Sequence, residues 1–164
     1  MTKTLFLLRH GKSDWSKAGH PDHDRPLNAR GKSAVPRVAA WLKAQSQSLD
    51  CVISSTAVRA KDTAFLVADE LGMKHNVVIL DQSLYLAEPE TYVQSLTHLS
   101  PNPKSVMLVG HNPGISELAT RLCSESIEMP TAALIQIELS ISLFSELSFS
   151  TPARLMHFIR PREL

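Results

Sequence analysis

Short apolar runs alternate along most of the chain with longer stretches in which apolar residues recur at helical spacing. The runs are almost continuously apolar, which favours strands that are covered on both faces of a parallel sheet. They are Thr4–Leu8, Cys51–Ser54, Val77–Leu80 and Ser105–Val109. The alternation therefore predicts an α/β fold built on a parallel sheet.

Four amphipathic stretches are predicted as helices that pack against this sheet. Gly72 is placed to end the second helix, and Asn112-Pro113 to begin the fourth as an N-cap followed by proline at the first helical position. The apolar positions, helix by helix, are Val35, Val38, Ala39 and Leu42; Ala60, Ala64, Val67, Ala68 and Leu71; Tyr92, Val93, Leu96 and Leu99; and Ile115, Leu118, Ala119 and Leu122.

The helical spacing disappears from Thr131 onward. Three extended segments are predicted there, at Ala133–Leu139, Leu143–Phe149 and Arg154–Ile159, so we expect the sheet to finish with adjacent strands. The other irregular region is residues 12–31, which hold two glycines, two prolines and almost no aliphatic residue. This composition predicts a surface loop. Its length is typical of a functional segment, with a merely solvated connection as the alternative.

Length and composition narrow the class of protein. The length of 164 residues predicts one domain over 1–164. Together with the predicted strands and helices, it indicates a three-layer α/β/α sandwich with a mostly parallel central sheet. The 43% hydrophobic and 20% charged content is typical of a soluble globular protein. Seventeen basic residues against sixteen acidic ones give a formal net charge of +1, which argues against a nucleic-acid or anionic-membrane partner.

The cysteine count and the first apolar run indicate a cytoplasmic location. Cys51 and Cys123 are too few for a disulfide framework or a thiolate zinc site, and they fit a reducing compartment. The run Leu5–Leu8 is interrupted at once by Arg9 and His10, so it is too short for a signal peptide or a membrane span.

Histidines and arginines follow three of the apolar runs. Ligands of open α/β sheets bind outside the carboxyl ends of the strands, so we expect Arg9, His10, Arg59 and His111 to converge there. Guanidinium groups match tetrahedral oxyanions, helix N-termini add further donors, and a neutral imidazole can attack phosphorus. Taken singly, each histidine has a structural alternative, and Arg59 could simply cover its own helix.

Four ordered blocks of sequence resemble the histidine phosphatase superfamily, and in particular its small SixA-like phosphohistidine phosphatases. The resemblance spans nearly the whole chain. The blocks are LLRHGKSDW at 7–15, DRPLNARG at 24–31, SSTAVRAKDTA at 54–64 and VGHNPG at 109–114.

This resemblance implies a phosphoglycerate-mutase-like fold and a covalent mechanism. His10 would be the nucleophile that forms a phosphohistidine intermediate, while Arg9, Arg59 and His111 would hold the phosphoryl oxygens. Metal independence is also implied, so no metal and no cofactor are predicted. The run His20-Pro-Asp-His-Asp24 has the residue types of a metal site but is interpreted as a solvated loop.

Each of the remaining candidate site residues has two possible roles. Many members of the superfamily use a carboxylate to protonate the leaving group, and Glu88 is the candidate here. Its alternative role is to precede a helix whose dipole favours a carboxylate. Ser13, Arg25 and Asn28 could reach the phosphate, or could only fix the shape of the loop. Lys12 replaces an acid that phosphoglycerate mutases carry, which argues against a mutase.

The leading hypothesis is a monomeric cytoplasmic phosphatase acting on phosphohistidine of a signalling or phosphotransfer protein. One alternative is a small-molecule phosphomonoesterase or mutase-like enzyme. Another is a non-catalytic phosphoprotein-binding module, which a nucleophilic imidazole placed among cations argues against. About twenty residues separate Tyr85 from Ser105, too few for a lid domain in addition to the predicted helix, so an open pocket is predicted. The sequence has no phosphate-binding loop of the nucleotide-hydrolase type.

Overall fold

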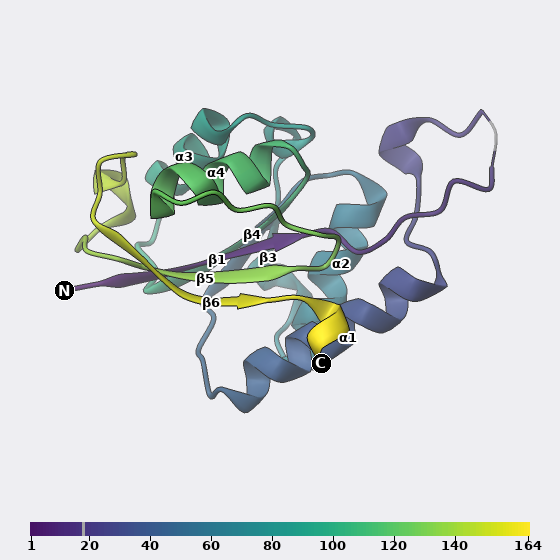
Figure 1. The fold of residues 1–164 in the computed structure, drawn as a ribbon, viewed down its shortest axis with the longest axis horizontal. Coiled ribbons are helices and arrows are strands. Elements are labelled where there is room, and N and C mark those ends of the chain that lie inside the picture. Colours follow the sequence, from purple (N-terminus) through teal and green to yellow (C-terminus); the bar gives the residue numbers. More distant parts are fainter. Residues whose placement is uncertain (18) are drawn as a thin grey trace.

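The computed structural model describes residues 1–17 and 19–164, and within them a six-stranded sheet carries helices on both faces (Figure 1). The spatial order of the strands is β3-β2-β4-β1-β5-β6. Their bounds are β1 Lys3–Arg9, β2 Cys51–Ser54, β3 Val78–Leu80, β4 Ser105–Gly110, β5 Leu134–Leu139 and β6 Ala153–Ile159. The predicted α/β fold with a mostly parallel sheet is therefore confirmed.

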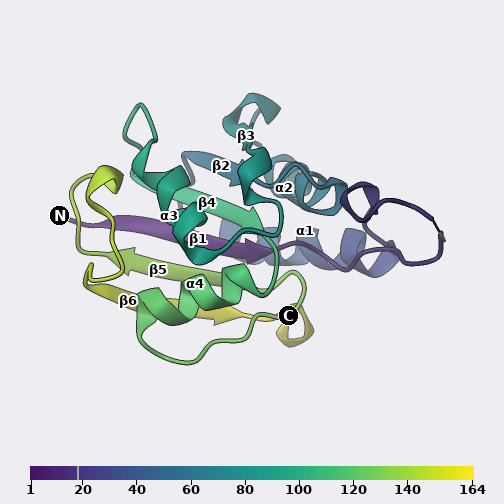
Figure 2. The same cartoon turned by 90° about the horizontal axis from the view of Figure 1, so that it is seen from above.

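The pairing directions divide the sheet into two parts. Strands β1, β4, β2 and β3 pair in parallel, and β5 pairs antiparallel with both β1 and β6. The parallel part coincides with the four apolar runs of the sequence. Since β1, β2 and β4 point the same way, their carboxyl ends reach one edge of the sheet (Figure 2).

Alternate residues of β1 explain why its sequence is continuously apolar. Leu5 and Leu7 belong to the core on the side of α3 (Pro89–Thr97) and α4 (Gly114–Cys123). Phe6 and Leu8 belong to the core on the side of α1 (Ala29–Ala44) and α2 (Val58–Glu70). All four side chains are fully buried. The period-two geometry of a strand thus supplies both layers of the sandwich.

The prediction of an extended segment at Leu143–Phe149 is wrong. A short 3-10 turn, η4, occupies Phe144–Glu146 instead, and the Glu146 carboxylate accepts the backbone N–H of Leu143 at 2.8 Å. The Phe144 side chain is buried in the core beneath it. The apolar residues of this segment therefore anchor a turn rather than extend the sheet.

Two helix starts differ from the predictions. The first helix begins inside the predicted loop, at Ala29, because the Asn28 side chain accepts the Gly31 N–H at 2.9 Å and caps it. The fourth helix begins at Gly114 with Pro113 as its N-cap, one residue later than expected. The end predicted for the second helix is confirmed, since α2 ends at Glu70 and Gly72, just after the C-cap Leu71, has a left-handed φ of +69°.

None of the helices in the described residues is long and apolar enough to cross a membrane.

Candidate active site

The imidazoles of His10 and His111 lie against each other where two central strands end. His10 follows β1 and His111 follows β4, and the register that pairs Arg9 with Gly110 makes them neighbours. Their ring centroids are 5.2 Å apart, and the backbone N–H of His10 donates to the Gly110 carbonyl at 3.1 Å. The parallel pairing of β1 and β4 therefore brings together two histidines a hundred residues apart in the chain.

The hydrogen bond of His10 determines which of its nitrogens is free. Nδ1 lies 2.7 Å from the carbonyl oxygen of Gly11. A carbonyl only accepts, so Nδ1 carries the proton and Nε2 has an available lone pair. Burial, together with the charges of Arg59 and Arg9, lowers the pKa of His10 to about 4. The ring is thus neutral at pH 7 and has the form that a nucleophile requires.

His111 is fixed by contacts at its ring and at its backbone. Its Nε2 lies 2.8 Å from the hydroxyl of Ser55, and its backbone N–H donates to the Tyr92 hydroxyl at 3.1 Å. Burial, with His10 and Arg59 close by, lowers its pKa to about 3. Its Nδ1 is buried and has no hydrogen-bond partner among the described residues.

Two arginines surround the histidine pair. Arg59, in the first turn of α2, is 3% exposed, and Arg9 is the last residue of β1. Arg9 donates through Nη1 to the Met129 carbonyl at 3.0 Å. The Nε atoms of both arginines are buried and lack partners among the described residues. These nitrogens are donors that a bound oxyanion would satisfy.

Asp22 is a site residue that the sequence did not reveal. Its carboxylate accepts from Arg59 Nη2 at 3.0 Å and from Arg25 Nε at 3.0 Å, and the Tyr85 hydroxyl also donates to it. The bond from Tyr85 and those from the two arginines lower the pKa of Asp22 to about 2. Asp22 belongs to the His20–Asp24 run, whose composition indicates a solvated loop and gives no sign of a contact with Arg59.

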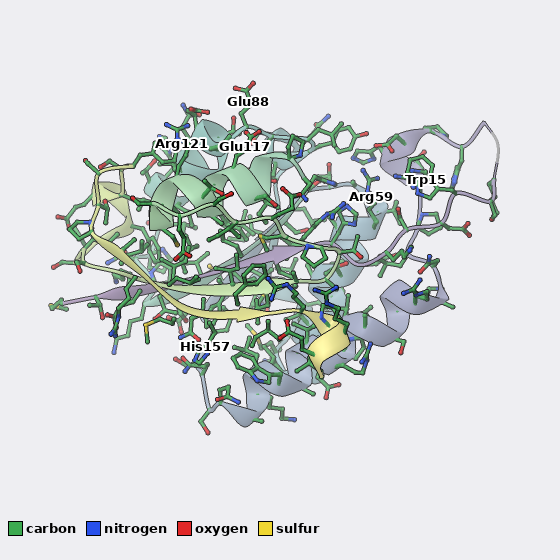
Figure 3. The ribbon with its side chains drawn as sticks, in the orientation of Figure 1. Trp15, Arg59, Glu88, Glu117, Arg121 and His157 are labelled. Atoms are coloured by element: carbon green, nitrogen blue, oxygen red, sulfur yellow. The ribbon has the colours of Figure 1, made fainter. Side chains whose placement is uncertain are left out.

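A pocket of about 260 Å³ forms at this edge of the sheet. Figure 3 shows Arg59 and Trp15 on the side of the molecule where the loop after β1 extends. None of the described residues lining the pocket is an aspartate or a glutamate, which suits a negatively charged ligand. The lining consists of Arg9, His10, Lys12, Ser13, Trp15, Arg25, Arg59, Leu86, His111, Asn112 and Thr131.

The three loop candidates differ in position. Ser13 and Arg25 line the pocket, where Arg25 Nη1 donates to the Ser13 hydroxyl at 2.8 Å. The Arg25 guanidinium also lies 3.3 Å from the centroid of the Trp15 ring. Asn28 is not part of the lining. It caps α1 and donates to the Ser13 carbonyl at 3.4 Å, so it holds the loop against the start of α1 without lining the pocket.

The structure does not bring Glu88 to this pocket. Glu88 is an exposed residue directly before α3 and points away from the body of the molecule (Figure 3). It lines a separate hollow of about 490 Å³ together with Glu90, Glu117 and Arg121. The carboxylate that does contact Arg25 and Arg59 is that of Asp22.

In residues 1–17 and 19–164, no three histidine, cysteine, aspartate or glutamate side chains are grouped so that they could hold a metal ion.

Comparison with known proteins defines the class. The family model of the histidine phosphatase superfamily (branch 1) matches residues 5–84. An uncharacterized protein of Mycobacterium tuberculosis, Rv1276c, is 34% identical over 119 residues, which cover 73% of this chain and 72% of that protein. The chain belongs to the histidine phosphatase superfamily and is a phosphatase of its SixA-like group.

The similarity to SixA proteins extends from sequence to fold. Phosphohistidine phosphatase SixA of Escherichia coli K12 is 29% identical over 122 residues, covering 73% of each chain. A protein described as SixA in Agrobacterium tumefaciens superposes with a TM-score of 0.82 at 26% identity, covering 97% of this chain and 98% of that one. The structure of a SixA complexed with tungstate superposes with a TM-score of 0.81 at 23% identity, covering 98% of both chains.

Proposed function

We propose that this phosphatase removes the phosphoryl group from phosphohistidine on a protein, through a covalent phosphohistidine formed at His10. The observation that carries the proposal is the hydrogen bond from His10 Nδ1 to the Gly11 carbonyl. It directs the free lone pair to Nε2, while burial and the charges of the neighbouring arginines lower the pKa of His10 to about 4 and keep the ring unprotonated at pH 7. A group with these properties at the centre of a cationic pocket is suited to attack phosphorus.

In the first half-reaction, a bond forms between His10 Nε2 and phosphorus while the phosphorus–nitrogen bond of the substrate breaks. The departing imidazole takes up a proton from water. Arg9, Arg59 and His111 stabilise the charge on the phosphoryl oxygens as the transfer proceeds. A dianionic phosphoryl group next to His111 would raise its pKa above the value in the free enzyme, which favours a donated hydrogen bond.

In the second half-reaction, a water oxygen attacks phosphorus and the bond to His10 Nε2 breaks. Phosphate and neutral His10 are the products. The proton taken up in the first half is released here, so the two steps sum to hydrolysis. The same cations serve both steps because the phosphoryl group is attacked in the same pocket each time.

The composition of the pocket favours phosphohistidine over a phosphate ester. An alkoxide leaving group needs a positioned acid, and no carboxyl group is among the described lining residues. The Asp22 carboxyl contacts Arg59, but its low pKa makes it ionised at pH 7, so it has no proton to give. Imidazole departs from a phosphoramidate much more easily, which removes the need for such an acid.

The surroundings of the pocket favour a substrate of protein size. Trp15 and Leu86 line it and are 76% and 56% exposed, so two large apolar side chains are available at its mouth. The crossover between Tyr85 and β4 holds α3 and short connections. Because this crossover has no room for an enclosing lid, binding energy remote from the phosphoryl group must come from a surface outside the pocket.

We propose that the substrate is a signalling or phosphotransfer protein, and that a monomer acts in the cytoplasm with residues 1–164 as one catalytic domain and without a cofactor. Two free cysteines, whose pKa values burial raises to about 11, support a reducing compartment. The SixA structure with tungstate, a tetrahedral oxyanion, supports phosphoryl binding on this fold.

The test is to compare a phosphohistidine protein with p-nitrophenyl phosphate as substrates of the purified enzyme. We expect the higher kcat/KM for the phosphohistidine protein, and labelled phosphate trapped on His10 by rapid quench into alkali. His10→Ala should abolish turnover, while Arg59→Ala and His111→Ala should each cost roughly 10²–10³-fold in kcat. A tenfold preference for a small phosphate ester, or native turnover by His10→Ala, would overturn the proposal.

A further inference from the structure

A larger hollow of about 820 Å³ adjoins the catalytic pocket. Arg9, Lys12 and Thr131 line both of them, so the two hollows meet at these three residues. The far wall consists of α1 and the C-terminal turn η5 (Pro161–Glu163), which lie side by side in Figure 1. The Arg37 guanidinium donates to the Pro161 carbonyl at 3.4 Å and ties the two elements together. A protein segment next to a phosphohistidine in the catalytic pocket would therefore lie close to this hollow.

The hollow is strongly basic, although the whole chain carries a formal charge of only +1. Six of its lining residues are cationic and a single one, Glu128, is acidic. Of the five cations beyond Arg9, only Arg160 forms an ion pair within the described part of the chain, with Glu163 at 3.1 Å. We call this hollow the basic groove, defined by Lys12, Arg30, Arg37, Arg160 and Arg162.

The spacing of the cations gives the groove a length. Arg30, Ser33, Ala34 and Arg37 line it from one face of α1, as residues three and four apart on a helix do. Seven residues of helix advance about 10 Å, which equals the rise of three residues of extended polypeptide. The groove is thus long enough for several residues of a chain in addition to the phosphoryl group held by His10.

We propose that the basic groove binds an acidic segment of the substrate protein next to its phosphohistidine. This inference rests on the proposed function and adds the chemistry of the partner. Carboxylates of aspartate or glutamate would pair with Arg30 and Arg37 while Arg9 holds the phosphoryl group. Because Arg30 and Arg37 are exposed at the rim, their effect falls on recognition rather than on the chemical step.

Two phosphohistidine peptides of equal length test the proposal, one with three glutamates beside the phosphohistidine and one with glutamines there. Wild-type enzyme should show a kcat/KM about 3- to 30-fold higher for the acidic peptide at low salt, as expected for two rim ion pairs. The preference should shrink toward unity at 0.5 M salt, because exposed pairs are screened.

The variant Arg30→Gln/Arg37→Gln removes two cations of the groove. It should lose the preference for the acidic peptide while hydrolysing the glutamine peptide at the wild-type rate. The matched control is Lys32→Gln/Lys43→Gln, which removes two exposed cations of the same helix outside the groove and should keep the preference. Loss of the preference in both variants would attribute it to general charge and overturn the inference.

The outcomes separate this inference from the proposed function. Equal kcat/KM for the two peptides in wild-type enzyme refutes the groove and leaves the phosphohistidine activity in place. Hydrolysis of p-nitrophenyl phosphate but of neither peptide refutes the proposed function, and with it a groove for the protein substrate. Competitive inhibition by an alkyl bisphosphate that depends on Arg30 and Arg37, without any peptide preference, would assign the groove to a small molecule and overturn the inference.

Discussion

Asp22 holds Arg59 by two atoms: its backbone carbonyl accepts from Nη1 at 2.7 Å, and its carboxylate accepts from Nη2 at 3.0 Å. Arg25 and Tyr85 donate to the same carboxylate. Asp22, in the loop after β1, therefore orients both Arg25 of the same loop and Arg59 of α2. The Nε of Arg59 is buried and has no partner among the described residues, so Asp22 engages only the two terminal nitrogens of this guanidinium.

Replacing Asp22 by asparagine should lower kcat about tenfold, because the two arginines lose a common ionic partner and their positions relax. KM should change less, since the cations themselves remain. Steady-state kinetics on the phosphohistidine protein measures the changes in kcat and in KM separately. Asp24→Asn, an exposed neighbour in the same turn, is the control and should behave as wild type. An unchanged kcat in Asp22→Asn would show that Arg59 is oriented without it.

The histidine pair should make stability depend on pH. Burial is the largest cause that lowers the pKa of His10 to about 4 and of His111 to about 3, whereas an unfolded histidine has a pKa near 6.5. Between pH 6.5 and 4 the unfolded chain therefore binds protons that the folded protein does not. The free energy of unfolding should fall as pH falls, by up to about 1.4 kcal/mol per pH unit for each histidine.

Urea denaturation at pH 7, 6, 5 and 4 measures this slope. His10→Gln should reduce the slope of the unfolding free energy against pH by the contribution of His10, because glutamine does not titrate. If wild type and His10→Gln lose stability in parallel over this range, His10 is not buried in its neutral form.

Tyr92 should contribute to stability through a single hydrogen bond to the site. Its hydroxyl accepts the backbone N–H of His111, and a Cβ on Gly110 would overlap that hydroxyl. Tyr92→Phe leaves a buried N–H without a partner, so the free energy of unfolding should fall by about 1–3 kcal/mol. Gly110→Ala should cost more, because the ring itself must move.

Urea unfolding and kcat, measured together, check the role of Tyr92. Both variants should also lower kcat, since His111 loses its anchor. Native stability in Tyr92→Phe would mean that another acceptor or water satisfies the His111 N–H.

Glu88→Gln should leave kcat/KM unchanged on both the phosphohistidine protein and p-nitrophenyl phosphate. The residue is exposed and outside the catalytic pocket, so it has no atom near the leaving group. Asp22→Asn, assayed in parallel, is the comparison that should lose activity. A selective loss of ester hydrolysis in Glu88→Gln would instead indicate that the segment before α3 moves to the pocket during turnover.

The apolar runs were sufficient to predict the parallel half of the sheet and the edge at which the candidate catalytic residues lie. Leu5–Leu8 must be covered on both faces, and a strand with that property lies in the middle of a layered fold. Because His10 and His111 each directly follow such a strand, the sequence was enough to predict that both lie at the carboxyl edge of the sheet, while the pairing of β1 with β4 makes them neighbours. The turn at Phe144–Glu146 escaped prediction, since apolar content does not distinguish an anchored turn from a strand.

The rest of the site depends on contacts between segments that are distant in the chain. Asp22 and Arg59 are 37 residues apart and belong to a loop and a helix, so no spacing along the chain relates them. Glu88 had a plausible sequence context, but the start of α3 turns it away from the pocket. The basic groove joins Arg30 and Arg37 of α1 to Arg160 and Arg162 near the other end of the chain. Periodicity reports which face of an element is buried, whereas the pairing of polar side chains depends on how the loops and helices pack, which the order of residues does not encode locally.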